Sequence, residues 1–294
     1  MTSVTALPGT LAAPHVTVSP ETLGWLAARA LRDEATLTPK PGLVDLRGGG
    51  AHDDMDVTTL LASADALAVP ITRCAEAAAC LPLGRDLRAE IGAIGRAGEQ
   101  RMLHATGGVN THRGALWVLG LLTAGLAATG TAGGAAGFAG RLAGIEDPAR
   151  PPRAPSHGAQ ARLRYGAAGA VGEAQAGFPH TMHVALPALH AARAAGHTEH
   201  TARTDALLAS MARLEDTCLL HRAGTVGLRV VRQRAAAILR AGGSGTDRGR
   251  ILLDDLDRVS RRLCLSPGGS GDVLAAALFM DSVISALSHA NGTE

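Results

Sequence analysis

The uncharged stretch GALWVLGLLTAGLAATGTAGGAAGFAG, residues 114–140, decides the fold class of this 294-residue chain. It is long enough to cross a bilayer. Glycines interrupt it repeatedly, however, and few strongly apolar residues follow Leu126. We therefore predict a buried central helix, Thr111 to Ala128, followed by a Gly-rich turn, and no membrane span.

Helical patterns continue on both sides of this stretch. Ser19, Pro20 and Glu21 combine an N-cap, a first-turn proline and an acidic first turn, and runs of β-branched or aromatic residues with period 2 are absent. The sequence predicts an all-α fold with a single globular multi-helix domain at 21–294, after a poorly ordered segment at 1–20. Beyond the first and central helices, we predict helices at 57–80 (ended or kinked by Pro70), 86–104, 179–195, 199–221, 225–240, 247–263 and 270–288, and loops at 146–158 and 242–249.

Composition excludes several classes of function. Lys plus Arg total 28 and Asp plus Glu total 26, so the formal net charge is +2, and aromatic residues make up 2%. Nucleic-acid binding needs a basic stripe or stacking rings, so we expect no nucleic-acid partner. The four cysteines form no C-x-x-C pair and the N-terminus lacks a signal-peptide pattern. We therefore expect a cytoplasmic protein with reduced thiols.

Lys40 is the only lysine of the chain and lies between two prolines. A compact ammonium suits a phosphate where an Arg fork does not fit, although a chance surface lysine would give the same pattern. Arg47 follows, and Gly48, Gly49 and Gly50 offer backbone N–H groups to phosphate oxygens. No P-loop pattern is present, so an ordinary turn is the alternative for these glycines.

Asp53, Asp54 and Asp56 place three carboxylates within four residues. One or two of them can cap the helix that follows, but three acids this close repel one another unless a cation lies among them. Mg²⁺ prefers oxygen ligands and is usually held by one or two carboxylates and substrate phosphates. The cluster predicts a site for Mg²⁺ and a nucleotide.

Glycine-rich segments precede three of the helical patterns, and free N–H groups at a helix start bind anions. We expect these helix starts to converge on an anionic ligand, although a capped core helix would explain each one alone. The segment at 169–179 contributes one carboxylate, Glu173. The other two segments contribute Gly108, Asn110, His112 and Arg113, and Gly268, Gly269, Ser270 and Asp272.

Five motifs in order carry a family resemblance: T-P-K-P-G-L-V-D at 38–45, A-H-D-D-M-D at 51–56, T-G-G-V-N-T-H-R-G at 106–114, G-E-A-x-x-G-F-P at 172–179 and S-P-G-G-S-x-D at 266–272. With them the chain resembles the triphosphoribosyl-dephospho-CoA synthase family of citrate lyase and malonate decarboxylase. The resemblance implies an all-helical enzyme that joins ATP to 3′-dephospho-CoA and releases adenine. The product is a prosthetic-group precursor, which passes to a phosphoribosyl-dephospho-CoA transferase and an acyl-carrier subunit. The A-H-D-D-M-D motif and the short chain favour the malonate decarboxylase branch, and a homo-oligomer is compatible with the family.

This reaction assigns roles to the residues singled out above. Transfer from a ribose passes through an oxocarbenium-like state and needs a general base and a firmly held triphosphate. Glu173 is our first choice of base, because an isolated carboxylate among small apolar residues has a raised pKa; Glu34 and Asp216 are second choices. We assign the triphosphate to Lys40, Arg47, His112 and Arg113, and Mg²⁺ to Asp53, Asp54, Asp56 and Asp272.

Two other classes of function stay open at this point. An all-helical, Mg²⁺-dependent ADP-ribosyl hydrolase would also use acidic clusters, but it would act with water and need no second nucleotide. A non-catalytic helical interaction protein would leave the motifs without a ligand, and ATP would not shift its melting temperature.

Overall fold

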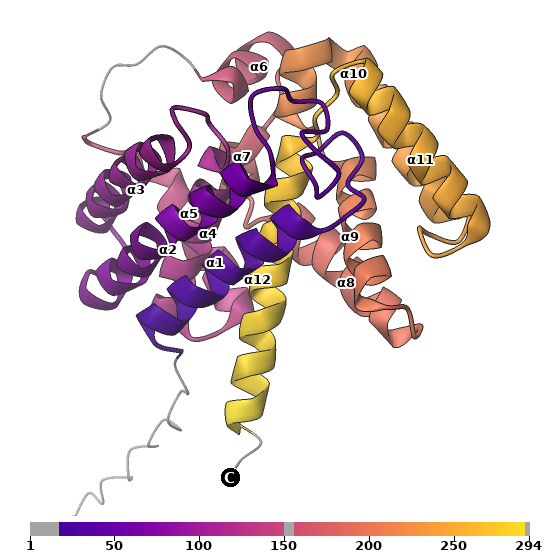
Figure 1. Ribbon diagram of the computed structural model, residues 1–294. Helices are drawn as coiled ribbons and strands as arrows, with labels where there is room; N and C mark the ends of the chain where they lie inside the picture. The colour runs from indigo at the N-terminus through magenta and orange to yellow at the C-terminus, as the bar shows by residue number, and fades with distance from the viewer. Residues whose placement is uncertain (1–17, 150–155, 292–294) are drawn as a thin grey trace, which may run out of the picture.

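The computed structural model describes residues 18–149 and 156–291 (Figure 1). Within these ranges the chain is all-helical, as predicted, and forms no strand beyond one isolated bridge between Asp45 and Gly48. Most of the predicted segment 1–20 lies outside the described residues. The helices are α1 (Pro20–Thr36), α2 (Val57–Cys80), α3 (Arg85–Ala105), α4 (Arg113–Thr129), α5 (Ala132–Gly144), α6 (His157–Tyr165), α7 (Gly169–Gln175), the π-helix η1 (Thr181–Ala185), α8 (Leu186–Ala194), α9 (Glu199–Arg213), α10 (Thr217–Arg240), α11 (Asp247–Arg262) and α12 (Gly268–Asn291).

The core is built around α4 and α12. In Figure 1, α12 runs through the middle of the molecule, with α1 to α5 on one side and α8 to α11 on the other. It packs against α1, α4 and α9. The segment Gly268–His289 is long and apolar enough to cross a membrane, yet 61% of its most apolar window is buried inside the protein. Its composition is therefore explained by the core position.

The segment predicted as a Gly-rich turn after the central helix is a helix instead. α4 ends at Gly130, whose φ of 69° is left-handed, and α5 leaves at an angle of 119° to it. A Cβ on Gly125 would lie 2.4 Å from the Ala135 carbonyl oxygen. The glycines here allow two helices to cross closely, which a count of helix propensity does not reveal.

Several predicted boundaries also shift. The predicted helix 199–221 is two helices, because Asp216 caps α10 after α9 has ended. The predicted break between residues 221 and 225 is confirmed as a kink in α10 at Gly224, whose φ of 62° and ψ of −161° are not helical. Pro70 lies inside α2 without ending it. α6 and α7 form in segments for which we predicted no helix, and residues 150–155 of the loop at 146–158 lie outside the described residues.

Candidate active site

The start of α12 is where widely separated parts of the chain meet. Its backbone contacts the capping residue of α10, its second turn touches the start of α4, and the end of α1 lies against Gly271. The loop at 37–56 joins it through a hydrogen bond between His52 Nε2 and Ser266 Oγ (2.8 Å). We call the polar side chains gathered here the central cluster: Glu34, Lys40, His112, Asp216 and Asp272.

Lys40 is bound to the end of α1. Its Nζ donates to Glu34 Oε1 at 2.7 Å and to the Glu34 carbonyl oxygen at 2.6 Å, and Lys40 is only 1% exposed. It is therefore not a chance surface lysine. The prediction that its ammonium is reserved for a phosphate is not supported, because Glu34 balances its charge.

Asp45 organises the loop that carries Lys40. Its buried carboxylate accepts hydrogen bonds from the Lys40 N–H and from the backbone and guanidinium of Arg47. Burial acts to raise the pKa of Asp45, but these hydrogen bonds outweigh it and the pKa lies below its ordinary value. Arg47 also contacts Asp257 at 3.1 Å. Two carboxylates thus balance Arg47, which we had assigned to a triphosphate.

The three glycines after Arg47 form a tight turn. Gly48 donates its N–H to the Asp45 carbonyl, so this N–H is not free for a phosphate as predicted. A Cβ on Gly49 would lie 2.2 Å from the His52 carbonyl oxygen, and one on Gly50 would lie 2.3 Å from that of Leu43. Close approach of the backbone explains these two glycines, which is the alternative that the sequence left open.

Asp216 joins the starts of two helices. Its Oδ1 accepts from the N–H groups of Cys218 and Leu219 at the start of α10, and its Oδ2 accepts from the N–H and Oγ of Ser270 in α12. Burial raises its pKa against these hydrogen bonds. Because its oxygens already accept from two helix starts, Asp216 is placed to hold the site together.

Asp272 lies inside the central cluster, in the second turn of α12. It is partly exposed and accepts a hydrogen bond from the backbone of Ala115 in α4. Burial, then the Asp216 and Glu34 carboxylates, raise the pKa of Asp272 well above its ordinary value. A carboxyl that is surrounded by acids and still accessible is suited to proton transfer.

Three of the glycines at these helix starts make room for carboxylates. A Cβ on Gly114 would lie 1.9 Å from Asp272 Oδ2, one on Gly269 would lie 3.2 Å from the Asp216 carboxylate, and one on Gly271 would lie 3.1 Å from Glu34 Oε1. Two of the three predicted helix starts, those of α4 and α12, converge at the central cluster. The anions that fill the starts of α10 and α12 are side chains of the protein, however.

The four residues that we assigned to the start of α4 lie in different environments. Gly108 and Asn110 are exposed, and Asn110 does not cap the helix, since His112 holds the N-cap position without a side-chain bond. Arg113 pairs with Glu99, which takes up its charge. His112 alone points into the protein, where its Nδ1 lies 2.8 Å from Ser63 Oγ.

The acidic triplet does not form the predicted four-carboxylate site. Asp56 caps α2 by accepting from the Thr59 N–H, Asp54 lies 3.4 Å from His52 Nδ1, and Asp53 is exposed. Asp272 belongs to the central cluster, beside Glu34. Among the described residues, no group of three His, Cys, Asp or Glu side chains is arranged to hold a metal ion.

Glu173 is not the isolated carboxylate that we predicted. It accepts from the His180 N–H and bonds His180 Nδ1, both at 2.7 Å. The backbone of Arg213 also bonds His180. Glu173 therefore ties α7 to η1 and to the end of α9, and no contact joins it to the central cluster in the described structure.

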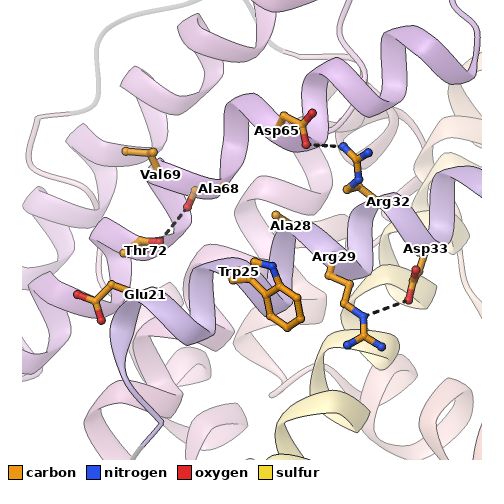
Figure 2. Close-up of a pocket in the computed structure, with 10 residues that line it drawn as sticks. All are labelled: Glu21, Trp25, Ala28, Arg29, Arg32, Asp33, Asp65, Ala68, Val69 and Thr72. Carbon is orange, nitrogen blue, oxygen red and sulfur yellow. Dashed lines mark hydrogen bonds and ion pairs between the residues drawn. The ribbon is translucent and has the colours of Figure 1, made fainter.

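A surface groove between α1 and α2 lies away from this cluster (Figure 2). Trp25 is exposed along it, and its arginines pair with its acids: Arg32 with Asp65 and Arg29 with Asp33. These pairs leave the groove with little charge to bind a nucleotide.

Comparison with known proteins identifies the family. The family described as CitG, ATP:dephospho-CoA triphosphoribosyl transferase, matches residues 20–290. This chain belongs to it. The protein is accordingly a transferase, and three members of the central cluster, Lys40, His112 and Asp272, belong to the motifs that carried the resemblance. No solved structure matches the chain.

Individual members of the triphosphoribosyl transferase family are similar along nearly the whole chain. A protein of Pseudomonas fluorescens, named probable 2-(5″-triphosphoribosyl)-3′-dephosphocoenzyme-A synthase, is 52% identical over 268 residues, 90% of this chain and 91% of the relative. One of Azotobacter vinelandii with the same name is 50% identical, over 87% and 89% of the two chains. A 2-(5″-triphosphoribosyl)-3′-dephosphocoenzyme-A synthase of Klebsiella pneumoniae is 46% identical, over 89% and 95%.

Sequence reasoning missed two residues at the family's candidate site. Ser63 lies fully buried against His112; the only signal was a serine on the otherwise apolar face of α2. Arg222 is exposed and donates to His52 Nδ1 at 3.1 Å. The signal in the sequence is the polar pair His221–Arg222 shortly before Gly224, to which we assigned no role.

Proposed function

We propose that the protein transfers the 5-triphosphoribosyl group of ATP to the 2′-hydroxyl of 3′-dephospho-CoA. Adenine leaves C1″ of the ribose, and the product is 2′-(5″-triphosphoribosyl)-3′-dephospho-CoA. The observation that carries the proposal is the partly exposed residue Asp272, whose carboxyl lies between Glu34 and the start of α4, in a chain that matches the family from residue 20 to 290.

Asp272 is our general base. Its raised pKa makes its carboxylate a stronger proton acceptor near neutral pH than an ordinary aspartate. It takes the proton from the 2′-hydroxyl as that oxygen bonds to C1″ and the bond from C1″ to adenine breaks. Glu34 and Lys40 form a fixed ion pair beside it, which limits movement of the site. Asp216 holds the helix starts in register.

The triphosphate belongs at the rim of the site and not inside it. Glu34, Asp216 and Asp272 would repel a triphosphate, whereas Arg222 at the rim bonds a histidine ring instead of a carboxylate. His52 connects this rim to the start of α12 through Ser266. We place the triphosphate against Arg222, with the ribose directed inward toward Asp272.

Mg²⁺ fits this arrangement only as a companion of the phosphates. Asp53 and Asp54 are exposed beside His52 and are the carboxylates available to it, and bound Mg²⁺ would neutralise part of the triphosphate charge. Replacing both with asparagine should weaken the Mg²⁺ dependence of ATP binding, followed by calorimetry, and leave the melting temperature unchanged. Parent-like Mg²⁺ dependence would remove these residues from the proposal.

The cellular role that we propose extends the same chemistry. The product would be the prosthetic-group precursor of malonate decarboxylase, in preference to citrate lyase, and would pass to a phosphoribosyl-dephospho-CoA transferase and then to an acyl-carrier subunit. We place the protein in the cytoplasm, and a homo-oligomer is compatible with this role. The A-H-D-D-M-D motif at residues 51–56 supports the choice of branch.

Mass analysis of a reaction with ATP, Mg²⁺ and dephospho-CoA tests the proposed function. We expect free adenine and the triphosphoribosyl adduct in equal amounts, and neither product when dephospho-CoA is left out. In a separate reaction with an ADP-ribosylated substrate and no dephospho-CoA, release of ADP-ribose by water would instead support the hydrolase alternative, and an absence of any nucleotide effect would support the interaction protein.

A further inference from the structure

His112 presents a polar atom that is left without a partner among the described residues. Its side chain is buried, and no described residue makes a hydrogen bond to its Nε2. The rest of the residue is firmly held: the backbone N–H donates to Met102 Sδ at 3.3 Å, and the carbonyl accepts from Leu116. A buried polar atom without a partner costs about 1–3 kcal/mol, so an acceptor or donor from a ligand would account for it.

The hydrogen bonds around Ser63 decide which ring nitrogen carries the proton. Thr111 Oγ1 donates to Ser63 Oγ at 2.7 Å, and Ser63 Oγ lies 2.8 Å from His112 Nδ1. Ser63 Oγ accepts from Thr111, and among the described residues its own hydrogen has no acceptor other than Nδ1, so this hydrogen is directed to the Nδ1 lone pair. Nδ1 is then the acceptor, and the ring hydrogen must be on Nε2.

The ring is also uncharged at neutral pH. Burial lowers the pKa of His112 to about 4; the Glu34 carboxylate opposes this shift and the Lys40 ammonium adds to it. A neutral imidazole N–H is a hydrogen-bond donor and not an acid. Such a donor, next to the carboxylates of the central cluster, suits an uncharged part of a ligand better than a triphosphate.

We propose that Thr111 and Ser63 are positioning residues that hold His112 with its hydrogen on Nε2, from which it donates to a ring nitrogen of the adenine of bound ATP. This inference rests on the proposed function and assigns His112 to the departure of adenine. As the bond from C1″ to adenine breaks, the bonding electron pair moves onto the base, and the N–H stabilises this charge without transferring its proton. The departing base then takes up a proton from water to give neutral adenine, while the proton of the 2′-hydroxyl stays on Asp272 until it is released to solvent. The sequence assigned His112 to the triphosphate; the structure leads us to assign it to the leaving group instead.

Nitrogen-15 NMR of histidine-labelled protein tests the proton position without any substrate. Comparison with His112→Gln assigns the His112 signal. We expect a protonated Nε2 in the parent, and a mixture of tautomers in Thr111→Val, which keeps the volume of the side chain but removes the hydroxyl. Thr111→Ser should restore the parent signal. A protonated Nδ1 in the parent, or an unchanged signal in Thr111→Val, would overturn the proposal.

Turnover then tests the contact with adenine. Thr111→Val and Ser63→Ala should each lower kcat about tenfold, the effect of one lost hydrogen bond, with little change in KM for dephospho-CoA, and Thr111→Ser should recover the rate. Deaza-ATP analogues each lack one ring nitrogen of adenine. The parent enzyme should turn over slowly the analogue that lacks the nitrogen accepting from His112, and Thr111→Val should not lower the rate with this analogue any further. A shifted tautomer with unchanged turnover would overturn the adenine contact. The expected tautomer in a protein that does not turn over ATP would instead contradict the proposed function.

Discussion

The ion pair of Lys40 and Glu34 is buried where the loop at 37–56 meets the end of α1. The lone lysine between two prolines indicated a special position, and the structure confirms it by burying Nζ 2.7 Å from Glu34 Oε1. Its partner could not be predicted, because Glu34 looks like any acid near the end of an amphipathic helix. The pair also binds the loop at 37–56 to α1.

Breaking this pair should cost stability before it affects binding. Lys40→Met leaves the Glu34 carboxylate buried without a counter-charge, and we expect unfolding free energy to fall by about 3–5 kcal/mol. Lys40→Arg should also be unfavourable, since a guanidinium does not fit a position that is 1% exposed. Urea unfolding of Lys40→Met with and without Glu34→Gln checks this. If the second change recovers no stability, the ion pair is not the reason for the loss.

At the scale of helices, the conformation of Gly224 determines the course of α10. Its φ of 62° with ψ of −161° lies in a region that essentially only glycine adopts. A Cβ there would also lie 3.2 Å from Tyr165 Oη. The sequence indicates a helix break near this position, and the non-helical conformation of Gly224 confirms it as a kink beside α6.

Gly224→Ala should therefore destabilise the protein by about 1–3 kcal/mol. Gly95→Ala is the matched control, because Gly95 lies inside α3 with nothing within 4 Å of a new Cβ; it should stabilise by roughly 0.5–1 kcal/mol. Thermal unfolding of the two variants measures the contrast. Equal effects of the two substitutions would show that the kink carries no special backbone requirement.

The hydrogen bonds between Glu173 in α7 and His180 at the start of η1 should make the stability of the protein depend on pH. Hydrogen bonding to Glu173 raises the pKa of His180, against the effect of burial. A group with a raised pKa in the folded state contributes stability that is complete below its ordinary pKa and is lost as pH rises through the folded-state value. The melting temperature of His180→Gln should thus fall short of the parent most at acidic pH and least at alkaline pH. A difference that grows as pH rises would contradict this account.

At the scale of the whole molecule, the sequence predicted the fold class and most helices, because apolar periodicity and caps such as Ser19 are local signals. It predicted part of the site for the same reason, because glycine-rich segments before a helix are local signals that mark where polar groups gather. It could not predict which acids meet. Asp272 was grouped with Asp53 by residue type, but the packing of α12 against α1 and α4 places it with Glu34. Glu173 has no acidic or basic neighbour nearby in the sequence, but in the structure it bonds His180.

The central claim is that Asp272 accepts the proton of the attacking hydroxyl, and the pH dependence of adenine release tests it most directly. At saturating ATP and dephospho-CoA, the parent rate should fall as pH drops through the raised pKa of Asp272, because the base must be ionised. Asp272→Asn should release adenine roughly 10²–10⁴-fold more slowly, lose this acidic limb and still bind ATP, while Glu173→Gln should keep the parent profile. A parent-like rate and pH profile in Asp272→Asn, or loss of the acidic limb in Glu173→Gln instead, would contradict the account.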